Sequence, residues 1–226
     1  MYLIDKKNLL IINKPKDWTS FDVVNKLKYM LKVKKIGHAG TLDPNATGVL
    51  VIGINNATKL LGQLTLDEKE YVADILFNIH TDTYDIVGQI LKEDNTKVDL
   101  LMIQNALQIL SSSPYYQMPP MHSAIKINGK KAYDFARKNI SLDLPKRLVE
   151  LKEYEIISFV NNILKIRLVV SKGFYVRSFA VDLADIMHTY AVLKDLQRTR
   201  SGHFRIDQAL EISDVYDYWT QTPTNK

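Results

Sequence analysis

The 226-residue chain contains no cysteine, so disulfide bonds and thiolate metal sites are excluded. No apolar run approaches the roughly 20 residues that a membrane-spanning helix needs, and residues 1–7 lack the apolar core of a signal peptide. Acidic side chains are fewer than basic ones, 25 against 30, which leaves a net charge of +5. We therefore expect a cytoplasmic protein that has no membrane partner.

The basic balance favours an acidic partner, of which nucleic acid is the commonest. Charge alone is equally compatible with a soluble protein that is merely basic. A hydrophobic share of 46% is enough for one sizeable core, so we expect a single domain over 1–226. The sequence shows no internal repeat, low-complexity tract or long linker.

Hydrophobic periodicity predicts more strands than helices. The alternation from 71 to 79 is typical of a strand with one buried face, and helical spacing from 23 to 31 predicts an amphipathic helix. The pair Asn161-Asn162 predicts a tight turn between two strands. A short helix is expected at 193–196. This pattern favours an α+β fold, with a mixed, largely antiparallel central sheet and flanking helices.

The segment 34–48, KKIGHAGTLDPNATG, is the strongest candidate for a functional site, and we interpret it as a loop. Its glycines let the backbone approach a ligand closely, and its basic surroundings favour an ionised, nucleophilic Asp43. It lacks the Gly-Lys-Ser/Thr ending of a P-loop. His38 has no histidine four residues later, so no metal site is indicated. Since Asp-Pro most often only starts a turn, the loop alone leaves a structural role for Asp43 open.

The segment 115–147 is basic and rich in proline and tyrosine. Alternation from 122 to 127, followed by Asn128-Gly129, predicts a hairpin, and a short helix is expected at 132–138. We interpret the whole segment as a projecting insertion that grips a nucleic acid. The alternative is an ordinary loop packed on the sheet.

Taken together, these motifs resemble the TruB family of tRNA pseudouridine synthases, in its bacterial stand-alone form. Six blocks match in the family's order, and they extend over nearly the whole chain. The blocks are Lys14-Pro15 with Ser20, Gly37-His38-Ala39-Gly40-Thr41-Leu42-Asp43-Pro44, Lys69-Glu70-Tyr71, Thr81-Asp82-Thr83-Tyr84-Asp85, Pro119-Pro120-Met121-His122-Ser123-Ala124 and Ser171-Lys172-Gly173-Phe174-Tyr175-Val176-Arg177-Ser178. The resemblance implies the pseudouridine synthase fold.

The resemblance also implies three catalytic residues. Asp43 would be the nucleophile, Tyr71 would stack on the target base and is the candidate base of the reaction, and Arg177 would pair with Asp43. Taken singly, Tyr71 is equally typical of a core strand and Arg177 of a helix start.

For substrate binding, the resemblance implies that His38 occupies the place of the displaced target nucleotide in the stack. Tyr175 and Leu196 would line the uracil pocket. Lysines that are candidates for phosphate contacts are Lys14, Lys26, Lys28, Lys34, Lys59, Lys130 and Lys131.

The activity implied is the isomerisation of uridine to pseudouridine at position 55, in the T-loop of tRNA. It needs base flipping but no cofactor or metal. We expect a monomer that binds the T-arm of tRNA without a guide RNA or partner protein, and that lacks the C-terminal PUA domain of many relatives. Two alternatives are a tRNA-binding folding chaperone and the same chemistry on another RNA that resembles the T-arm.

The chain departs from the family pattern in three places. Asn13 stands where an aspartate is usual, Ala191-Val192 where Ala-His is frequent, and Leu196-Gln197-Arg198 where Leu-Arg-Arg is usual. These departures put peripheral RNA contacts in doubt but leave the three catalytic positions intact.

Overall fold

The computed structural model describes residues 8–122, 126–127, 130–131 and 144–221. The chain forms two compact units, of which unit 1 comprises Met1–Tyr71 and Leu196–Lys226 and unit 2 comprises Val72–Asp195. Strands β4 (Lys69–Phe77) and β13 (Ala191–Ser201) each have residues in both units. The single domain expected over 1–226 stays a prediction.

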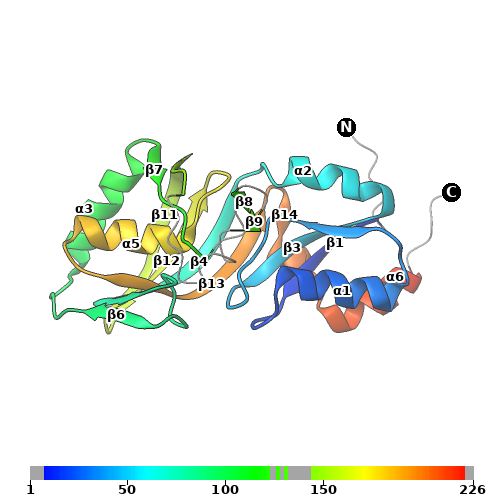
Figure 1. Ribbon diagram of the computed structural model, residues 1–226, viewed down its shortest axis with the longest axis horizontal. Helices are drawn as coiled ribbons and strands as arrows, with labels where there is room; N and C mark the ends of the chain where they lie inside the picture. Colours follow the sequence, from blue (N-terminus) through cyan, green and yellow to red (C-terminus); the bar gives the residue numbers. More distant parts are fainter. Residues whose placement is uncertain (1–7, 123–125, 128–129, 132–143, 222–226) are drawn as a thin grey trace. The chain divides into compact units, whose positions relative to one another are not determined.

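Unit 1 is built around β1 and β3, which pair in antiparallel fashion. Its elements besides parts of β4 and β13 are β1 (Leu9–Lys14), α1 (Ser20–Leu31), β2 (Ile36–Ala39), β3 (Thr47–Ile54), η2 (Asn55–Leu60), α2 (Leu61–Leu64), β14 (Phe204–Arg205), η3 (Ile206–Gln208), η4 (Ile212–Asp214) and α6 (Val215–Gln221). Helices α1 and α6 lie beside the strands (Figure 1), and with β1 and β3 they form one hydrophobic core. The smaller core on the other face is formed by β2, β3 and α2.

Helix α1 begins at Ser20, three residues before the helical spacing that predicts it. The Thr19 hydroxyl accepts a hydrogen bond from the Asp22 backbone N–H at 3.0 Å, and the Asp22 carboxylate accepts one from the Thr19 N–H at 2.9 Å. This reciprocal capping box satisfies two of the N–H groups that a helix start leaves unpaired. The helix therefore has a fixed beginning, and the residues just before it have fixed positions.

The loop predicted over 34–48 is wrong at 36–39 and at 47–48, where strand β3 begins. Ile36–Ala39 form strand β2, which pairs with β3 and places His38 opposite Ile52. The sequence of β2 has no alternating pattern, so only its pairing with β3 makes it a strand. The irregular part of the segment is thereby shortened to 40–46, with Asp43 in its middle.

Unit 2 is a layer of helices on a sheet. Its elements besides parts of β4 and β13 are β5 (Ile79–Thr81), β6 (Ile90–Glu93), α3 (Leu100–Ser111), β7 (Tyr115–Gln117), β8 (Lys126–Ile127), β9 (Lys130–Lys131), β10 (Arg147–Val149), β11 (Leu151–Val160), β12 (Ile163–Val170) and α5 (Val176–Ile186). Helices α3 and α5 lie side by side against the strands (Figure 1). The alternation predicted for β4 is confirmed at Tyr71, Ala73, Ile75 and Phe77, which are buried.

The predicted turn between β11 and β12 is confirmed, because Asn161 and Asn162 both have positive φ, 52° and 59°. The helix predicted at 193–196 is wrong, because these residues belong to β13. A four-residue apolar run does not distinguish a helix from a strand, and here pairing with distant strands decides. Hydrogen bonds order the strands β1-β3-β13 in unit 1 and β13-β4-β12-β11 in unit 2. The predicted α+β class with a largely antiparallel sheet is confirmed.

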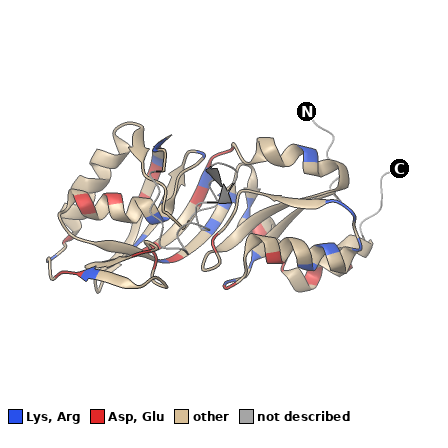
Figure 2. Cartoon of the chain, viewed as in Figure 1, with Lys and Arg blue, Asp and Glu red and all other residues tan. Residues whose placement is uncertain are grey.

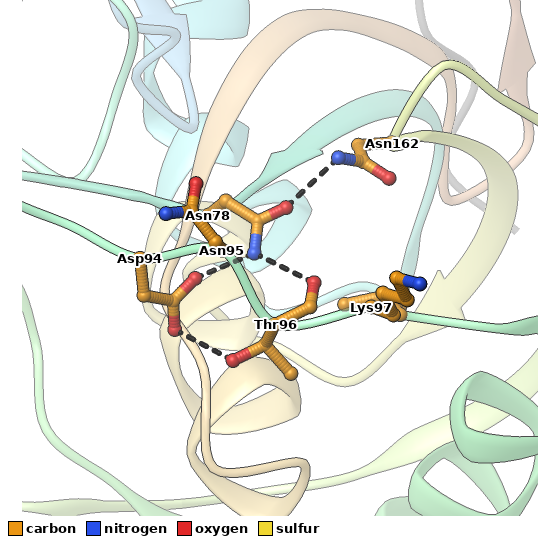
Figure 3. Close-up of a pocket in the computed structure, with 7 residues that line it drawn as sticks. Asn78, Asp94, Asn95, Thr96, Lys97 and Asn162 are labelled. Carbon is orange, nitrogen blue, oxygen red and sulfur yellow. Dashed lines mark hydrogen bonds between the residues drawn. The ribbon is translucent and has the colours of Figure 1, made fainter.

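Asn78, which follows β4, holds several connections of unit 2 together. It has positive φ, 72°, and its side-chain amide donates to the Asp94 carboxylate, the Thr96 carbonyl and the Thr189 hydroxyl. Its amide oxygen accepts from Asn162 at 2.9 Å. A pocket of about 520 Å³ is lined by four of these residues, Asn78, Asp94, Thr96 and Asn162 (Figure 3). Because they bond one another, the arrangement stabilises the fold.

The described parts of the segment 115–147 contain two strand pairs, one of which was predicted. Strand β7 pairs with β10, and β8 pairs with β9 as the two arms of the predicted hairpin. The turn predicted at 128–129 and the helix predicted at 132–138 lie outside the described residues. The gripping role of the insertion therefore stays a prediction.

Candidate active site

The backbone on each side of Asp43 is held by a buried side chain of unit 1. On one side, the Ser20 hydroxyl accepts a hydrogen bond from the Leu42 N–H at 2.9 Å and donates to the Leu42 carbonyl at 3.1 Å. On the other side, the Lys14 ammonium donates to the Pro44 carbonyl at 3.1 Å. Fixing the neighbours of a reactive carboxylate limits the directions in which it can point, which is the basis of catalysis by orientation.

Lys14 is fully buried, so the prediction that it contacts a phosphate is wrong. It holds the loop instead, through its bond to the Pro44 carbonyl. Its ammonium also donates to the carbonyls of Pro15 and Trp18, at 2.8 and 2.5 Å. Burial lowers the pKa of Lys14 to about 8, against the attraction of Asp43 and Asp17, which raises it. The ammonium form is therefore favoured at neutral pH, and its three N–H groups match the three carbonyl acceptors.

Arg198, on β13, fastens both ends of the same loop. It is 1% exposed, and its guanidinium donates from Nε to the Val49 carbonyl at 2.7 Å and from Nη2 to the Gly40 carbonyl at 2.9 Å. Its backbone pairs in parallel with Gly48. Only glycine fits there, because φ is 101° and a Cβ atom would lie 2.2 Å from the Arg198 carbonyl oxygen. Sequence reasoning missed this role, since it treated the Leu-Gln-Arg motif as a peripheral RNA contact.

His38, Tyr71 and Leu196 also lie in unit 1, on β2, β4 and β13. The Nδ1 atom of His38 is buried and has no hydrogen-bond partner among the described residues. Burial, with the nearby Arg198 charge, lowers the pKa of His38, so its ring is neutral at pH 7. Tyr71 and Leu196 are each 8% exposed. Unit 1 thus contains five of the predicted site residues, including Asp43 and Lys14.

The two remaining site residues, Tyr175 and Arg177, lie at the start of α5 in unit 2. Arg177 is buried, and it donates to the carbonyls of Thr83 and His122 at 3.1 and 2.9 Å. These contacts fix the guanidinium in the unit. The predicted pairing of Arg177 with Asp43 stays a prediction.

The start of α5 is fastened by Gln117, which is 1% exposed. Its amide oxygen accepts from the Tyr175 N–H at 2.7 Å, and its amide nitrogen donates to Tyr115 and Asp182 at 3.1 and 3.2 Å. Burial raises the pKa of Asp182 to about 6, although its hydrogen bonds to Gln117 and Tyr115 lower it. This first part of the segment 115–147 is therefore bonded to the start of α5 within unit 2.

In the described ranges, no group of three or more histidine, aspartate or glutamate side chains could hold a metal ion. Within the same ranges, every helix is too short or too polar to span a membrane.

Comparison with known proteins shows the relationships of the chain. Residues 28–176 match the N-terminal domain of the TruB family of pseudouridylate synthases. The chain is 56% identical over 221 residues to tRNA pseudouridine synthase B of Ureaplasma urealyticum, an alignment that covers 97% of this chain and 96% of the relative. It is 42% identical over 210 residues to the protein of the same name from Mycoplasmoides gallisepticum, covering 93% and 95%.

Among solved structures, the fold is similar to a chain in the crystal structure of a Cbf5-Nop10-Gar1 complex. The TM-score is 0.73 at 26% sequence identity, and the match covers 95% of this chain and 56% of that chain. The domain match over residues 28–176 spans more than half of the sequence, and it agrees with the ordered motifs and with the fold. The chain therefore belongs to the TruB family of pseudouridine synthases.

Proposed function

We propose that this protein isomerises uridine to pseudouridine at position 55, in the T-loop of tRNA. The observation that carries the proposal is the fixed backbone on both sides of Asp43, held by Ser20 and Lys14. The names of the relatives, which are 56% and 42% identical, supply the substrate. The proposed site of action is the cytoplasm.

The reaction breaks the bond between N1 of uracil and C1′ of ribose and forms a bond between C5 and C1′. The C5 proton leaves and N1 gains a proton, so nothing is oxidised or reduced and no atom is added. In the proposed mechanism, Asp43 acts as the nucleophile at C1′ and leaves again when C5 attacks. Arg177 keeps the Asp43 carboxylate charged and oriented.

The target uridine must first leave the stacked T-loop. We assign the vacated position to His38, because a neutral imidazole ring can stack between bases without carrying a charge into the stack. Tyr71 stacks on the flipped uracil and accepts the C5 proton. Tyr175 and Leu196 line the pocket that holds the uracil.

The test uses the purified protein alone, with an unmodified tRNA transcript and EDTA in the buffer, because we propose that a monomer acts without a guide RNA, partner protein, cofactor or metal. Pseudouridine is then mapped along the RNA. We expect modification at position 55 of the transcript and none in a matched transcript that has cytidine there.

Two results would contradict the proposal, and each would favour one of the alternative functions. If the protein binds the transcript and leaves uridine 55 unchanged, it is a tRNA-binding chaperone. If it modifies another hairpin that resembles the T-arm but leaves tRNA unmodified, the chemistry is right and the substrate is wrong.

A further inference from the structure

Helix α1 turns one stripe of side chains toward the core and a very different stripe toward solvent. The inward stripe is Val23, Val24, Leu27 and Leu31. The solvent-facing stripe, which we name the outer face of α1, is Phe21, Asn25, Lys28, Tyr29 and Lys32. These five positions share one side of the helix because residues three and four apart are neighbours on its surface.

The outer face exposes two large aromatic rings. Tyr29 is 87% exposed and Phe21 is 65% exposed. A depression of about 550 Å³ lies beside Tyr29 and is also lined by Lys28 and Lys32. Exposed apolar surface grouped in this way is typical of a contact surface.

Charge on the outer face beyond the first turn of α1 is positive. Between Asp22 and Asp43 the sequence has five lysines and no acidic residue. Asp22 itself is exposed in the first turn, where its carboxylate accepts the hydrogen bonds of Thr19, and Figure 2 accordingly shows both colours on α1. Lysines near the end of a helix complement the helix dipole, which accounts for Lys28 and Lys32. The dipole does not account for an exposed tyrosine between them, whereas the combination of cations and an aromatic ring suits single-stranded RNA.

Lys32 has a backbone conformation that costs stability. It is the residue after α1, its φ is 52°, and its N–H bonds the Lys28 carbonyl. Glycine is the residue that usually closes a helix in this left-handed conformation, because a Cβ atom strains it. The chain therefore has a cation at a position where glycine would be more stable.

We propose that the outer face of α1 is a second contact surface for the substrate RNA. In this arrangement, Lys28 and Lys32 bind backbone phosphates, and Tyr29 stacks on an unpaired base of the same RNA. The inference rests on the proposed function, since it takes the RNA substrate from there. It adds a surface that acts in binding and not in the chemical step.

The test measures kcat and KM for tRNA over a range of salt concentrations. Neutralising two phosphate contacts with Lys28→Gln and Lys32→Gln together should raise KM about tenfold at low salt and make its dependence on salt shallower by about 1.5 in a log–log plot. Tyr29→Ala should raise KM about fivefold, while Tyr29→Phe keeps the stacking ring and should change it little. In all of these variants kcat should stay the same.

Lys32→Gly separates binding from stability. It should raise Tm, because it relieves the strained backbone, and it should also raise KM, because it removes a cation. The matched control is Lys97→Gln, which neutralises an exposed lysine of unit 2 and should leave KM unchanged.

Unchanged KM in the Lys28, Tyr29 and Lys32 variants, with an active wild type, would overturn this inference alone. An inactive wild type would instead overturn the proposed function. A last measurement compares the binding of wild type and variants to vesicles that contain phosphatidylglycerol. If the variants lose binding to these vesicles while KM for tRNA stays the same, the outer face of α1 meets a membrane surface and the proposal is wrong.

Discussion

Arg198 and Gly40 are joined by a hydrogen bond of 2.9 Å from Nη2 to the backbone carbonyl, across 158 positions of sequence. The same guanidinium reaches the Val49 carbonyl at 2.7 Å. One buried side chain therefore ties the entry of the Asp43 loop to its exit. The planar fork of arginine makes both bonds at once, which a single ammonium group cannot reproduce in the same geometry.

Arg198→Lys should therefore lower kcat about a hundredfold, because a small displacement of a catalytic group is enough for a loss of this size. KM should change about twofold at most, since Arg198 is buried and acts through the loop. Steady-state kinetics on tRNA check this, at a temperature where circular dichroism shows the variant folded. The control is Arg200→Lys on the same strand, because Arg200 bonds Glu68 and the Gly202 carbonyl instead of the loop. A rise in KM with unchanged kcat would refute the positioning role.

Lys14→Met should lower the free energy of unfolding by about 1–3 kcal/mol or more, because the carbonyls of Pro15, Trp18 and Pro44 lose their buried donor. Urea unfolding measures the loss. Lys26→Met, which changes an exposed lysine, is the control and should have little effect. Equal stability of the two variants would show that the three bonds contribute nothing.

The same pair of proteins gives a pH test. Because the pKa of Lys14 is lowered to about 8 from 10.5, the unfolded chain binds more protons than the folded one between these two values. Stability contributed by this residue therefore rises with pH across that window. The difference in unfolding free energy between wild type and Lys14→Met should increase from pH 8 to pH 10, and a constant difference would contradict the burial argument.

Asp182→Asn should stabilise the protein at pH 7.5 and not at pH 4. Burial raises the pKa of Asp182 to about 6 from 3.8, so the folded state binds more protons than the unfolded state between these values. Wild-type stability from this residue is then greatest below pH 3.8 and is lost as pH rises to about 6. The expected gain of the variant above pH 6 is about 1–3 kcal/mol, measured by unfolding at both pH values. A variant that is less stable at pH 7.5 would show that the charged form is favoured.

Asn78→Ala should destabilise the protein by about 2–4 kcal/mol, because it strains a backbone with positive φ and removes the hub of four hydrogen bonds. Asn78→Gly removes the same hydrogen bonds, but glycine adopts the positive φ of this position without strain. It should therefore destabilise the protein less than Asn78→Ala. Thermal unfolding compares the two. Activity below the melting transition should be the same in both, and a loss of kcat without a loss of Tm would assign Asn78 to the site instead.

Local patterns predicted the parts of the fold whose cause is local. The helical spacing of α1, the alternation along β4 and the turn at Asn161-Asn162 all depend on residues close together in sequence. Strand β2 and the first part of β13, residues 191–196, were not predicted as strands, because their pairing partners impose the extended conformation on sequences without a strand pattern.

The same distinction applies to the site. Ordered motifs predict that Asp43 and its neighbours form the site, but they do not predict the buried hydrogen bonds that hold them. The partners of Arg198 are carbonyl groups, which every residue has, so no side-chain pattern marks them. Lys14 was predicted as a phosphate contact because its sequence neighbours do not show that it is buried. Its ammonium is bonded instead to the carbonyls of Trp18 and Pro44.

The most direct test of the account is the release of tritium from tRNA that is labelled at C5 of uracil, because forming the C5–C1′ bond expels that hydrogen. Wild-type protein should release one equivalent per tRNA, and Asp43→Asn, which removes the nucleophile with little change in shape, should release none while still binding the tRNA. Release by Asp43→Asn at the wild-type rate would contradict the central role of Asp43.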